Sequence, residues 1–354
     1  MFAAESKAMS APAADTLNSE PANSWKQIVE PVEPFLEAVS RRLAKEASGF
    51  DPAILPYADY TLNGHGKQLR PVLVALTAKA LGKTTESHVL VAVIIEMVHL
   101  ATLVHDDVMD EAEIRRGRPT LAANWGNEIA VLFGDCLFAN ALRLAASFPT
   151  PEICRAVATA TNTVCAGEIL QTRHRRDFQF TRERYLKALE MKTAELFALS
   201  CELSACLSGP VRPERPALRQ FGLAFGTAYQ IYDDCVDLFG SEAAAGKSLG
   251  TDLAKGKLTM PVLLLREQAD AADRARLEEL IQDWQNHSLE DLAGLLSKYE
   301  TLPASLEIMR QYLDKSRQAL NSLPSSEGHA GLLSLTDYLS RHSAALGSAP
   351  ASSV

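Results

Sequence analysis

The sequence predicts an all-α fold, a single bundle of about ten or more helices around a deep central cavity. Three observations indicate it. Long apolar segments repeat at helical spacing, no part shows the strand–helix alternation of a βαβ protein, and nothing marks a domain boundary. The chain has 354 residues and is 47% hydrophobic, enough for one large core. We expect disordered tails at 1–24 and 347–354, one domain at 25–346 and strand content near zero.

The first helix is expected at 25–47, where Pro31 and Pro34 restrict the first turns. A Gly-rich turn at 62–67 leads into Leu69-Arg70-Pro71 and another apolar helix. The segment 86–109 is apolar on nearly every face, but it carries Glu96 and ends in acids, so we expect a core helix and no transmembrane segment. Further helices are expected at 124–146, 152–172, 185–207 and 219–239, and three or four amphipathic helices with no identifiable chemistry at 270–346.

The composition excludes several classes of function. The net charge of −9 and the lack of a basic block argue against binding to nucleic acid. Six cysteines lie in apolar segments without CxxC or Cys/His metal spacing, which predicts free thiols in a reducing, cytoplasmic compartment. The N-terminal segment has neither the apolar core of a signal peptide nor the Arg-rich character of a transit peptide.

Two acidic motifs of identical spacing end two of the apolar segments. Asp106-Asp107-Val108-Met109-Asp110 is the first, and Asp233-Asp234-Cys235-Val236-Asp237 is the second. Residues four apart share a helix face, so each motif presents paired carboxylates. One such motif alone is equally typical of a solvated face, but two favour a magnesium diphosphate held between them. The predicted metal ligands are Asp106, Asp107, Asp110, Asp233, Asp234 and Asp237.

With these motifs in place, the sequence resembles the trans-isoprenyl (polyprenyl) diphosphate synthases, and among them the long-chain octaprenyl- and solanesyl-type members. The resemblance covers about 25–346, and one departure is His65-Gly66, where the family usually has two glycines. It implies an isoprenoid-synthase-type bundle, a Mg²⁺-dependent condensation of an allylic diphosphate with isopentenyl diphosphate, and a homodimer. The residues that carry it are Gly66 to Pro71, His99 to Arg116, Lys192-Thr193, Gln230 to Asp237, and Gly246 to Pro261.

The resemblance also implies roles for individual residues. Lys67, Arg70, His99 and Arg116 would bind isopentenyl diphosphate, and Arg115 would face the allylic diphosphate. Lys192, Thr193 and Gln230 would surround the reacting carbon and the leaving oxygen. Lys247 and Lys257 would close over the leaving group, and Asp106, Asp110 and Asp233 would act in catalysis through the metal.

The residues by themselves leave blander alternatives open. Lys67, Arg70, Lys247 and Lys257 also fit ordinary surface cations, and His99 fits a satisfied core histidine. Glu96-Met97-Val98-His99 matches the Glu-x-x-His of di-iron bundles, but the chain has no second copy. We expect the charged cluster at 173–177 to be solvated surface.

Product length should depend on the residues four and five positions before Asp106, which lie about 6 to 7.5 Å deeper along the helix. These are Thr102 and Ala101. Neither is aromatic, which predicts an open tunnel and a long-chain, all-trans product of octaprenyl class. Alternatively, Ala101 is small only to let two helices approach. A further turn down lie Val98 and Met97, and Phe138 on the neighbouring helix is a candidate for the floor.

Three other functions compete with this prediction. A shorter-chain farnesyl or geranylgeranyl diphosphate synthase would share every motif. A class I terpene cyclase would share the first acidic motif but usually has an Asn/Ser/Glu-type second motif. A non-catalytic subunit of a heteromeric synthase would have lost aspartates that this chain retains.

Overall fold

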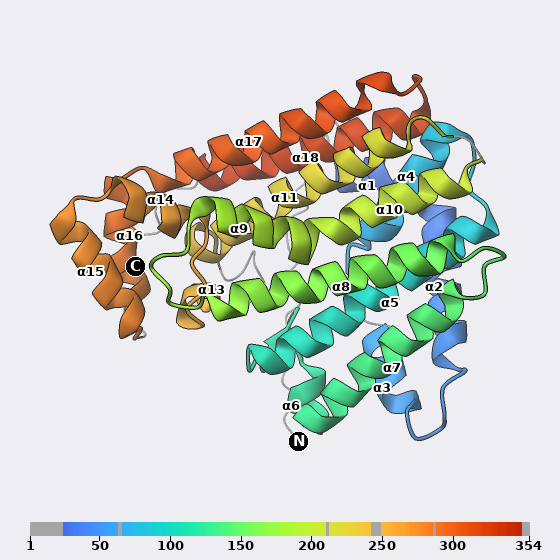
Figure 1. Cartoon of the computed structure of the whole chain (residues 1–354), viewed down its shortest axis with the longest axis horizontal. Coiled ribbons are helices and arrows are strands. Elements are labelled where there is room, and N and C mark those ends of the chain that lie inside the picture. The colour runs from blue at the N-terminus through green and yellow to red at the C-terminus, as the bar shows by residue number, and fades with distance from the viewer. Residues whose placement is uncertain (1–23, 63–65, 210–211, 242–248, 286–287, 349–354) are drawn as a thin grey trace, which may run out of the picture.

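The computed structural model describes residues 24–62, 66–209, 212–241, 249–285 and 288–348. Within these residues the chain is almost entirely helical (Figure 1), which confirms the predicted all-α class. A single antiparallel hairpin of two-residue strands is the only sheet in the described part of the chain. The predicted tails lie outside the described residues, apart from Ser24 and the last two residues of the final helix, which ends at Ser348.

The elements follow one another with short connections. In chain order they are α1 (Trp25–Val29), η1 (Glu30–Val32), α2 (Glu33–Ala47), α3 (Leu55–Leu62), α4 (Leu69–Leu81), α5 (Glu86–Met109), β1 (Ile114–Arg115), β2 (Arg118–Pro119), α6 (Leu121–Trp125), α7 (Asn127–Ala145), α8 (Glu152–Arg173), α9 (Arg182–Leu189), η2 (Glu190–Ala194), α10 (Glu195–Leu207), α11 (Arg215–Phe239), α13 (Thr251–Ala254), α14 (Met260–Gln268), α15 (Ala271–Gln282), α16 (Ser288–Lys298), α17 (Thr301–Ala319), η3 (Leu320–Ser322) and α18 (Glu327–Ser348).

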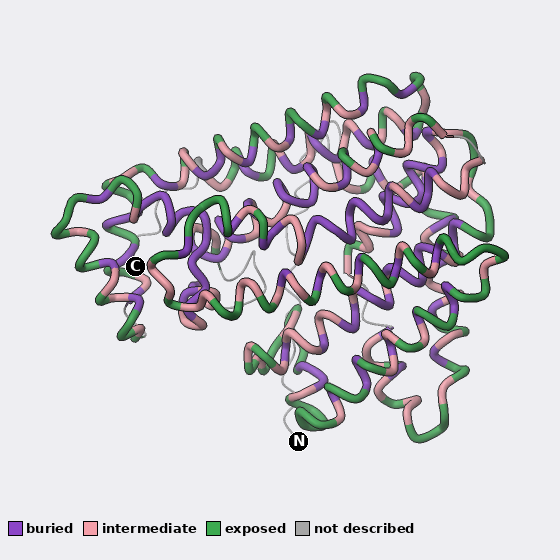
Figure 2. Tube along the Cα trace, viewed as in Figure 1, coloured by how far each residue is buried: buried purple, intermediate pink, exposed green. Residues whose placement is uncertain are grey.

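Helix α5 lies at the centre of the bundle. It packs against α7 most extensively and also against α4, α10 and α2. By length and composition α5 would be able to cross a membrane, yet 67% of its most apolar window is buried inside the protein, as expected of a core helix. Figure 2 shows the buried residues gathered in the interior helices, whereas outer helices such as α15 are largely exposed.

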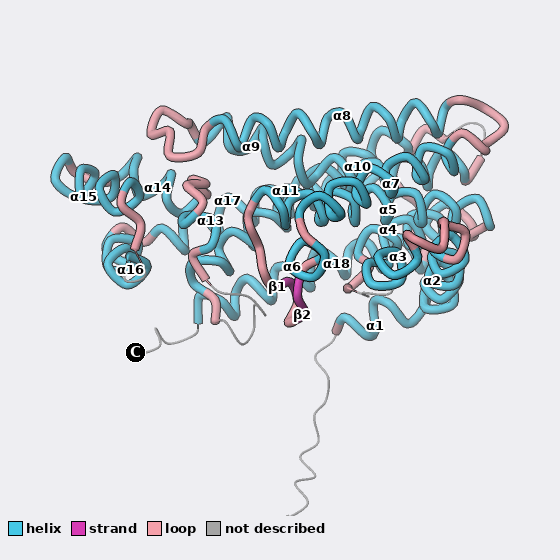
Figure 3. Tube along the Cα trace, turned by 90° about the horizontal axis from the view of Figure 1, so that it is seen from below, coloured by secondary structure: helices cyan, strands magenta, loops and turns pink. Residues whose placement is uncertain are grey.

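Helix α11 is the second central element, and it packs against α10 and α17. Gly222 allows the close approach to α10, because a Cβ at that position would come within 2.5 Å of the Phe197 carbonyl oxygen. In Figure 3, α8 and α9 form an outer layer on one face, and the hairpin and α6 lie on the opposite face. The C-terminal ends of α5 and α11 both point towards α13 (Figure 1), so the two acidic motifs meet at one end of the bundle.

Four predicted helices differ in detail from the structure. The helix expected at 219–239 begins four residues earlier, at Arg215, with Pro216 in its first turn. The segment at 25–47 is divided at η1, because Pro31 and Pro34 occupy first-turn positions of new helical segments. The helix expected at 124–146 begins only at Asn127, since Gly126 has a φ of 88° and ends α6. The segment at 185–207 contains the π-helical turn η2 between α9 and α10. Each difference arises from local backbone geometry within a correctly expected helical segment.

Candidate active site

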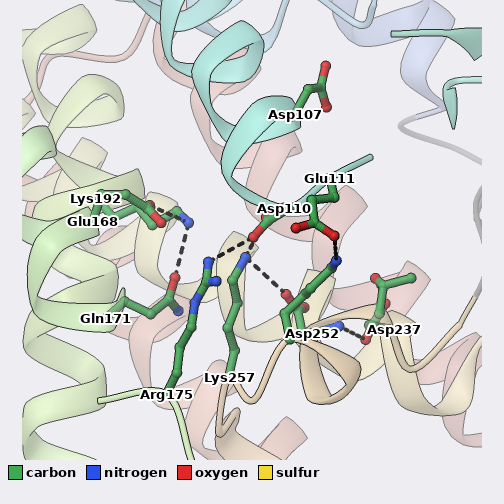
Figure 4. A network of polar contacts seen from close by, with 12 residues as sticks. Asp107, Asp110, Glu111, Glu168, Gln171, Arg175, Lys192, Asp237, Asp252 and Lys257 are labelled. Atoms are coloured by element: carbon green, nitrogen blue, oxygen red, sulfur yellow. Dashed lines mark hydrogen bonds and ion pairs between the residues drawn. The ribbon is translucent and has the colours of Figure 1, made fainter. Parts of the chain in front are cut away.

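Both acidic motifs occupy C-terminal ends of long helices, where the helix dipole favours cations over carboxylates. Asp106 and Asp110 lie in the last turn of α5 and at its C-cap, and Asp233, Asp234 and Asp237 lie in the last turns of α11. Carboxylates in such positions need nearby positive charge. The structure supplies it from side chains distant in the sequence (Figure 4).

Asp110 lies between two cations. Arg175 Nη2 donates to Asp110 Oδ1 at 2.9 Å, and Lys257 Nζ donates to Oδ2 at 2.6 Å (Figure 4). Burial opposes ionisation of Asp110, but Lys257, Lys192 and Arg175 hold its pKa below the ordinary value. The expectation that 173–177 is solvated surface is therefore wrong for Arg175, which the loop after α8 turns towards Asp110.

Asp106 faces a second charged group, formed by Lys192 of η2 and Glu168 of α8. Burial raises the pKa of Asp106 to about 6, with Lys192 opposing this rise and Glu168 adding to it. Lys192 Nζ contacts Glu168 Oε2 at 2.5 Å and donates to Gln171 Oε1 at 3.0 Å. Burial alone would lower the pKa of Lys192, but the negative charges of Asp106 and Glu168 outweigh burial and raise the pKa above its ordinary value. This lysine is therefore positively charged.

The π-helical turn η2 and Gly167 together position this group. A π-helical turn inserts one extra residue per turn and shifts the side chains that follow, which is common at functional sites. A Cβ on Gly167 would come within 2.6 Å of the backbone nitrogen of Lys192, so only glycine lets α8 approach η2 this closely. Glu168 and Gln171 were not among the predicted site residues. Their spacing on one face of α8 was the available signal.

Asp107 points away from these cations. Successive residues of a helix are rotated by about 100°, so Asp107 cannot share a face with Asp106 and Asp110. Arg115 Nε donates to Asp107 Oδ1 at 2.7 Å, and Figure 4 shows Asp107 apart from the network around Asp110. The predicted role of Asp107 as a metal ligand would require this ion pair to open.

In the second motif, Asp234 is buried and held by two donors. Tyr185 Oη donates to Asp234 Oδ2 at 2.6 Å, and Gln230 Nε2 donates to Oδ1 at 2.8 Å. Burial raises the pKa of Asp234 to about 8, and nearby Asp252 adds to this rise. Thr193 Oγ1 in turn donates to Gln230 Oε1 at 2.9 Å, so the predicted pair Thr193 and Gln230 is in contact.

The other two aspartates of this motif differ in accessibility. Asp237 is fully buried, and its carboxylate accepts hydrogen bonds from Thr251 Oγ1 at 2.9 Å and from the backbone N–H of Asp252 at 3.2 Å. Asp233 is only partly buried. Of the three aspartates, Asp233 is therefore the one best placed to meet a ligand.

A cluster of cations, which we call the cationic pocket, surrounds the face of α5 that carries Glu96 and His99; it comprises Arg70, Arg115 and Arg116. Burial lowers the pKa of His99 well below its ordinary value, and Arg70, Arg116 and Arg115 lower it further, so His99 is neutral. Arg70 Cζ lies 4.8 Å from the centre of the Phe197 ring. Neither Arg70 Nε nor Glu96 Oε2 has a hydrogen-bond partner within the described residues, which leaves two buried polar atoms available beside this pocket.

Arg116 and Lys67, also predicted to bind substrate, lie at the edges of the cationic pocket. The guanidinium of Arg116 packs on Gly66, where a Cβ would come within 2.3 Å of it. Lys67 is exposed, and its Nζ donates to Tyr338 Oη of α18 at 3.3 Å, so the C-terminal helices that we expected to lack chemistry reach the site. Lys247 lies outside the described residues.

The residues predicted to set product length lie one turn below the first motif on α5. Ala101 is fully buried, and Thr102 is partly buried with its hydroxyl donating to the His99 carbonyl at 2.7 Å. Phe138 was a candidate floor a further turn down. Its ring lies 5.7 Å from that of His105, and Asn140 Nδ2 contacts Met97 Sδ at 3.6 Å.

The donor set fits a metal bound together with a phosphate better than it fits a bare metal. Within the described residues, no three acidic, histidine or cysteine side chains converge into a ready-made metal cluster. Asp106 and Asp110 offer the hard oxygen ligands that Mg²⁺ prefers, but cations already crowd them. A metal accompanied by a polyanion satisfies both charges at once, because the anion pairs with the lysines and arginines.

Known proteins are similar to this chain in sequence and fold. A family model described as polyprenyl synthetase matches residues 51–298. The octaprenyl diphosphate synthase of Haemophilus influenzae is 31% identical over 318 residues, covering 90% of this chain and 96% of that protein. The nonaprenyl diphosphate synthase of Mycobacterium tuberculosis is 37% identical over 292 residues, covering 80% and 85%. The crystal structure of a polyprenyl synthase from Caulobacter crescentus CB15, complexed with calcium and isoprenyl diphosphate, is 32% identical with a TM-score of 0.84, covering 90% and 98%.

Proposed function

The chain belongs to the polyprenyl synthetase family and is a trans-prenyltransferase, and from this we propose that it adds isopentenyl diphosphate repeatedly to an allylic diphosphate to make a product of octaprenyl class. The observation that carries the proposal is that Lys192, Lys257 and Arg175 surround Asp106 and Asp110, beside a second group of cations around His99. Two diphosphate substrates need two separate cationic binding sites. The allylic diphosphate must ionise, and isopentenyl diphosphate must stay intact.

The acidic half of the site suits the allylic diphosphate. Mg²⁺ held by Asp106, Asp110 and Asp233 would neutralise negative charge on the departing diphosphate. Lys192 and Lys257 lie beside these carboxylates, already desolvated, and would place positive charge on the same oxygens. The carbon–oxygen bond breaks with its electron pair leaving on the diphosphate. Thr193 and Gln230, which are in contact with each other, would direct their dipoles at the resulting allylic cation.

The cationic pocket suits isopentenyl diphosphate. Arg70 and Arg116 bind phosphate without depending on pH, because guanidinium groups stay charged, and neutral His99 is left to donate or accept a hydrogen bond. The double bond of isopentenyl diphosphate attacks the cation, a carbon–carbon bond forms, and a proton leaves to the released diphosphate. No side-chain nucleophile is needed.

A homodimer is part of the proposal. Large apolar side chains are exposed on α7 and α8, where Val131 is 41%, Leu132 61% and Ile169 60% exposed. A second copy covering these two helices would bury them. Sedimentation of the purified protein at several concentrations measures the assembly. We also propose a cytoplasmic location, supported by six free thiols.

Incubation with farnesyl and isopentenyl diphosphates and Mg²⁺ tests the proposal. A long linear diphosphate supports it, whereas a cyclic hydrocarbon indicates a cyclase and no product indicates a non-catalytic subunit. Asp106→Ala or Asp233→Ala should lower turnover by about a hundredfold or more while leaving the circular dichroism spectrum unchanged, since each removes a metal ligand. Near-normal turnover of either variant at saturating Mg²⁺ would show that the metal assignment is wrong.

A further inference from the structure

Asp237 joins the last turn of α11 to the start of the segment Gly250–Lys257, which includes α13. Its two carboxylate oxygens accept from the backbone N–H of Asp252 at 3.2 Å (Figure 4) and from Thr251 Oγ1 at 2.9 Å. Its carbonyl accepts from the Gly250 N–H at 2.8 Å. The residue is 0% exposed. Both oxygens are thus already engaged away from solvent.

The far end of the same segment places a site residue. The backbone N–H of Arg176 donates to the Gly256 carbonyl at 2.7 Å, and the N–H of Lys257 donates to the Asp252 carbonyl at 2.8 Å. These two bonds hold the peptide group between Gly256 and Lys257 from both of its ends. The Lys257 ammonium then reaches Asp110 at 2.6 Å and Asp252 at 3.7 Å, with its side chain only 5% exposed. The position of Lys257 therefore depends on how Gly250–Lys257 is held.

For Asp237 to bind a metal, its carboxylate would have to leave both donors and become exposed. A buried N–H or hydroxyl left without an acceptor costs more than the original bond contributed. Asp233, four residues earlier on the same face, is only partly buried, so its carboxylate is the more accessible of the two. Asp233 and Asp237 thus differ in their surroundings, although the spacing of the motif treats them alike.

We propose that Asp237 is a positioning residue that latches Gly250–Lys257 to α11 and so holds the Lys257 ammonium at Asp110. Because Lys257 is assigned to the diphosphate leaving group, this inference rests on the proposed function. The latch itself is a property of the free protein, which allows it to be tested separately.

Hydrogen–deuterium exchange of the protein without substrates tests the latch directly. Asp237→Ala removes both acceptors, and Thr251→Val removes one donor without touching a carboxylate. Both variants should raise deuterium uptake in 250–257, and Thr251→Ser, which keeps the hydroxyl, should resemble the wild type. Wild-type exchange of this segment in Thr251→Val would overturn the inference, and that comparison remains decisive if Asp237→Ala does not fold.

Steady-state kinetics separate a latch from a metal ligand. Thr251→Val and Asp237→Ala should lower kcat/KM for the allylic diphosphate by about tenfold, the worth of one hydrogen bond to a charged group. The Mg²⁺ concentration for half-maximal rate should stay within about twofold of the wild type, whereas Asp233→Ala should raise it. In a Lys257→Met background, Asp237→Ala should cost little more.

A Mg²⁺ requirement that rises in Asp237→Ala as much as in Asp233→Ala, with exchange of 250–257 unchanged, would show that Asp237 is a ligand. If the wild type made no prenyl product at all, the proposed function would fail while the exchange results still decided the latch.

Discussion

Ala101→Tyr is expected to shorten the product. Ala101 lies five residues before Asp106 on α5 and is 0% exposed, so a larger side chain there enters the protein interior rather than solvent. If the growing chain runs back along α5 from the metal site, the new ring would stand in its path. The wild type has no aromatic side chain at this position or at Thr102.

The expected length follows from helix geometry. Five residues at 1.5 Å each place Ala101 about 7.5 Å below Asp106 along the helix axis. An isoprene unit adds four chain bonds of about 1.5 Å each, so it advances the chain by roughly 5 Å when zigzagged. A chain of about two units therefore already reaches the ring, and elongation should stop soon afterwards, at about three or four units. The first condensations occur above this layer and should keep their rate.

The assay is product analysis of wild type and variant at the same ratio of isopentenyl to allylic diphosphate. Ala101→Ser, which adds only a hydroxyl, serves as the control and should keep the long product. Urea unfolding belongs in the same experiment, because a ring forced into a packed core would cost about 1–3 kcal/mol. A small loss of stability together with a short product supports the tunnel.

Two results would refute the tunnel argument. One is an unchanged product length in a folded Ala101→Tyr variant, above all if its stability falls, since Ala101 would then be small only to let helices pack. The other is a wild type that already stops at farnesyl diphosphate.

Three further predictions follow from individual contacts. Arg70→Ala should raise the KM for isopentenyl diphosphate by about tenfold or more and that for the allylic primer far less, because a charged phosphate contact is lost in one pocket only; equal effects would mean that the pocket is misassigned. Tyr185→Phe, which removes a fully buried hydrogen bond to Asp234, should lower the free energy of unfolding by about 1–3 kcal/mol. Tyr299→Phe, which removes a bond to Asp273 and one from the backbone N–H of Asp270 nearer the surface, should cost clearly less; urea denaturation compares the two variants. Burial lowers the pKa of His88 below 6.5, so on acidification the unfolded chain takes up the proton first. The free energy of unfolding should therefore fall as the pH drops below about 6.5, by at most about 1.4 kcal/mol per pH unit from this group; an equally steep decline in His88→Asn would contradict it.

The sequence by itself determined what depends on neighbours along the chain. The bounds of α5 matched the apolar pattern at both ends. The helix begins directly after its N-cap Thr85 and ends in the first acidic motif, so the residues that limit it are part of the local sequence. The four-residue spacing placed Asp106 and Asp110 on one face for the same local reason. The motifs also indicated the family, which the comparisons confirm.

Only the tertiary structure decided which charges meet. Arg175 looked like solvated surface within its own segment, and Glu168 and Gln171 looked like ordinary helical polar residues. Their partners Asp110 and Lys192 lie far away in the chain, and the contacts exist because α8 packs against η2 at Gly167. The equal spacing of the two acidic motifs likewise concealed that Asp237 is buried against Thr251. Spacing along a helix fixes the direction of a side chain, but the element packed opposite determines whether that side chain meets solvent, a cation or a backbone N–H.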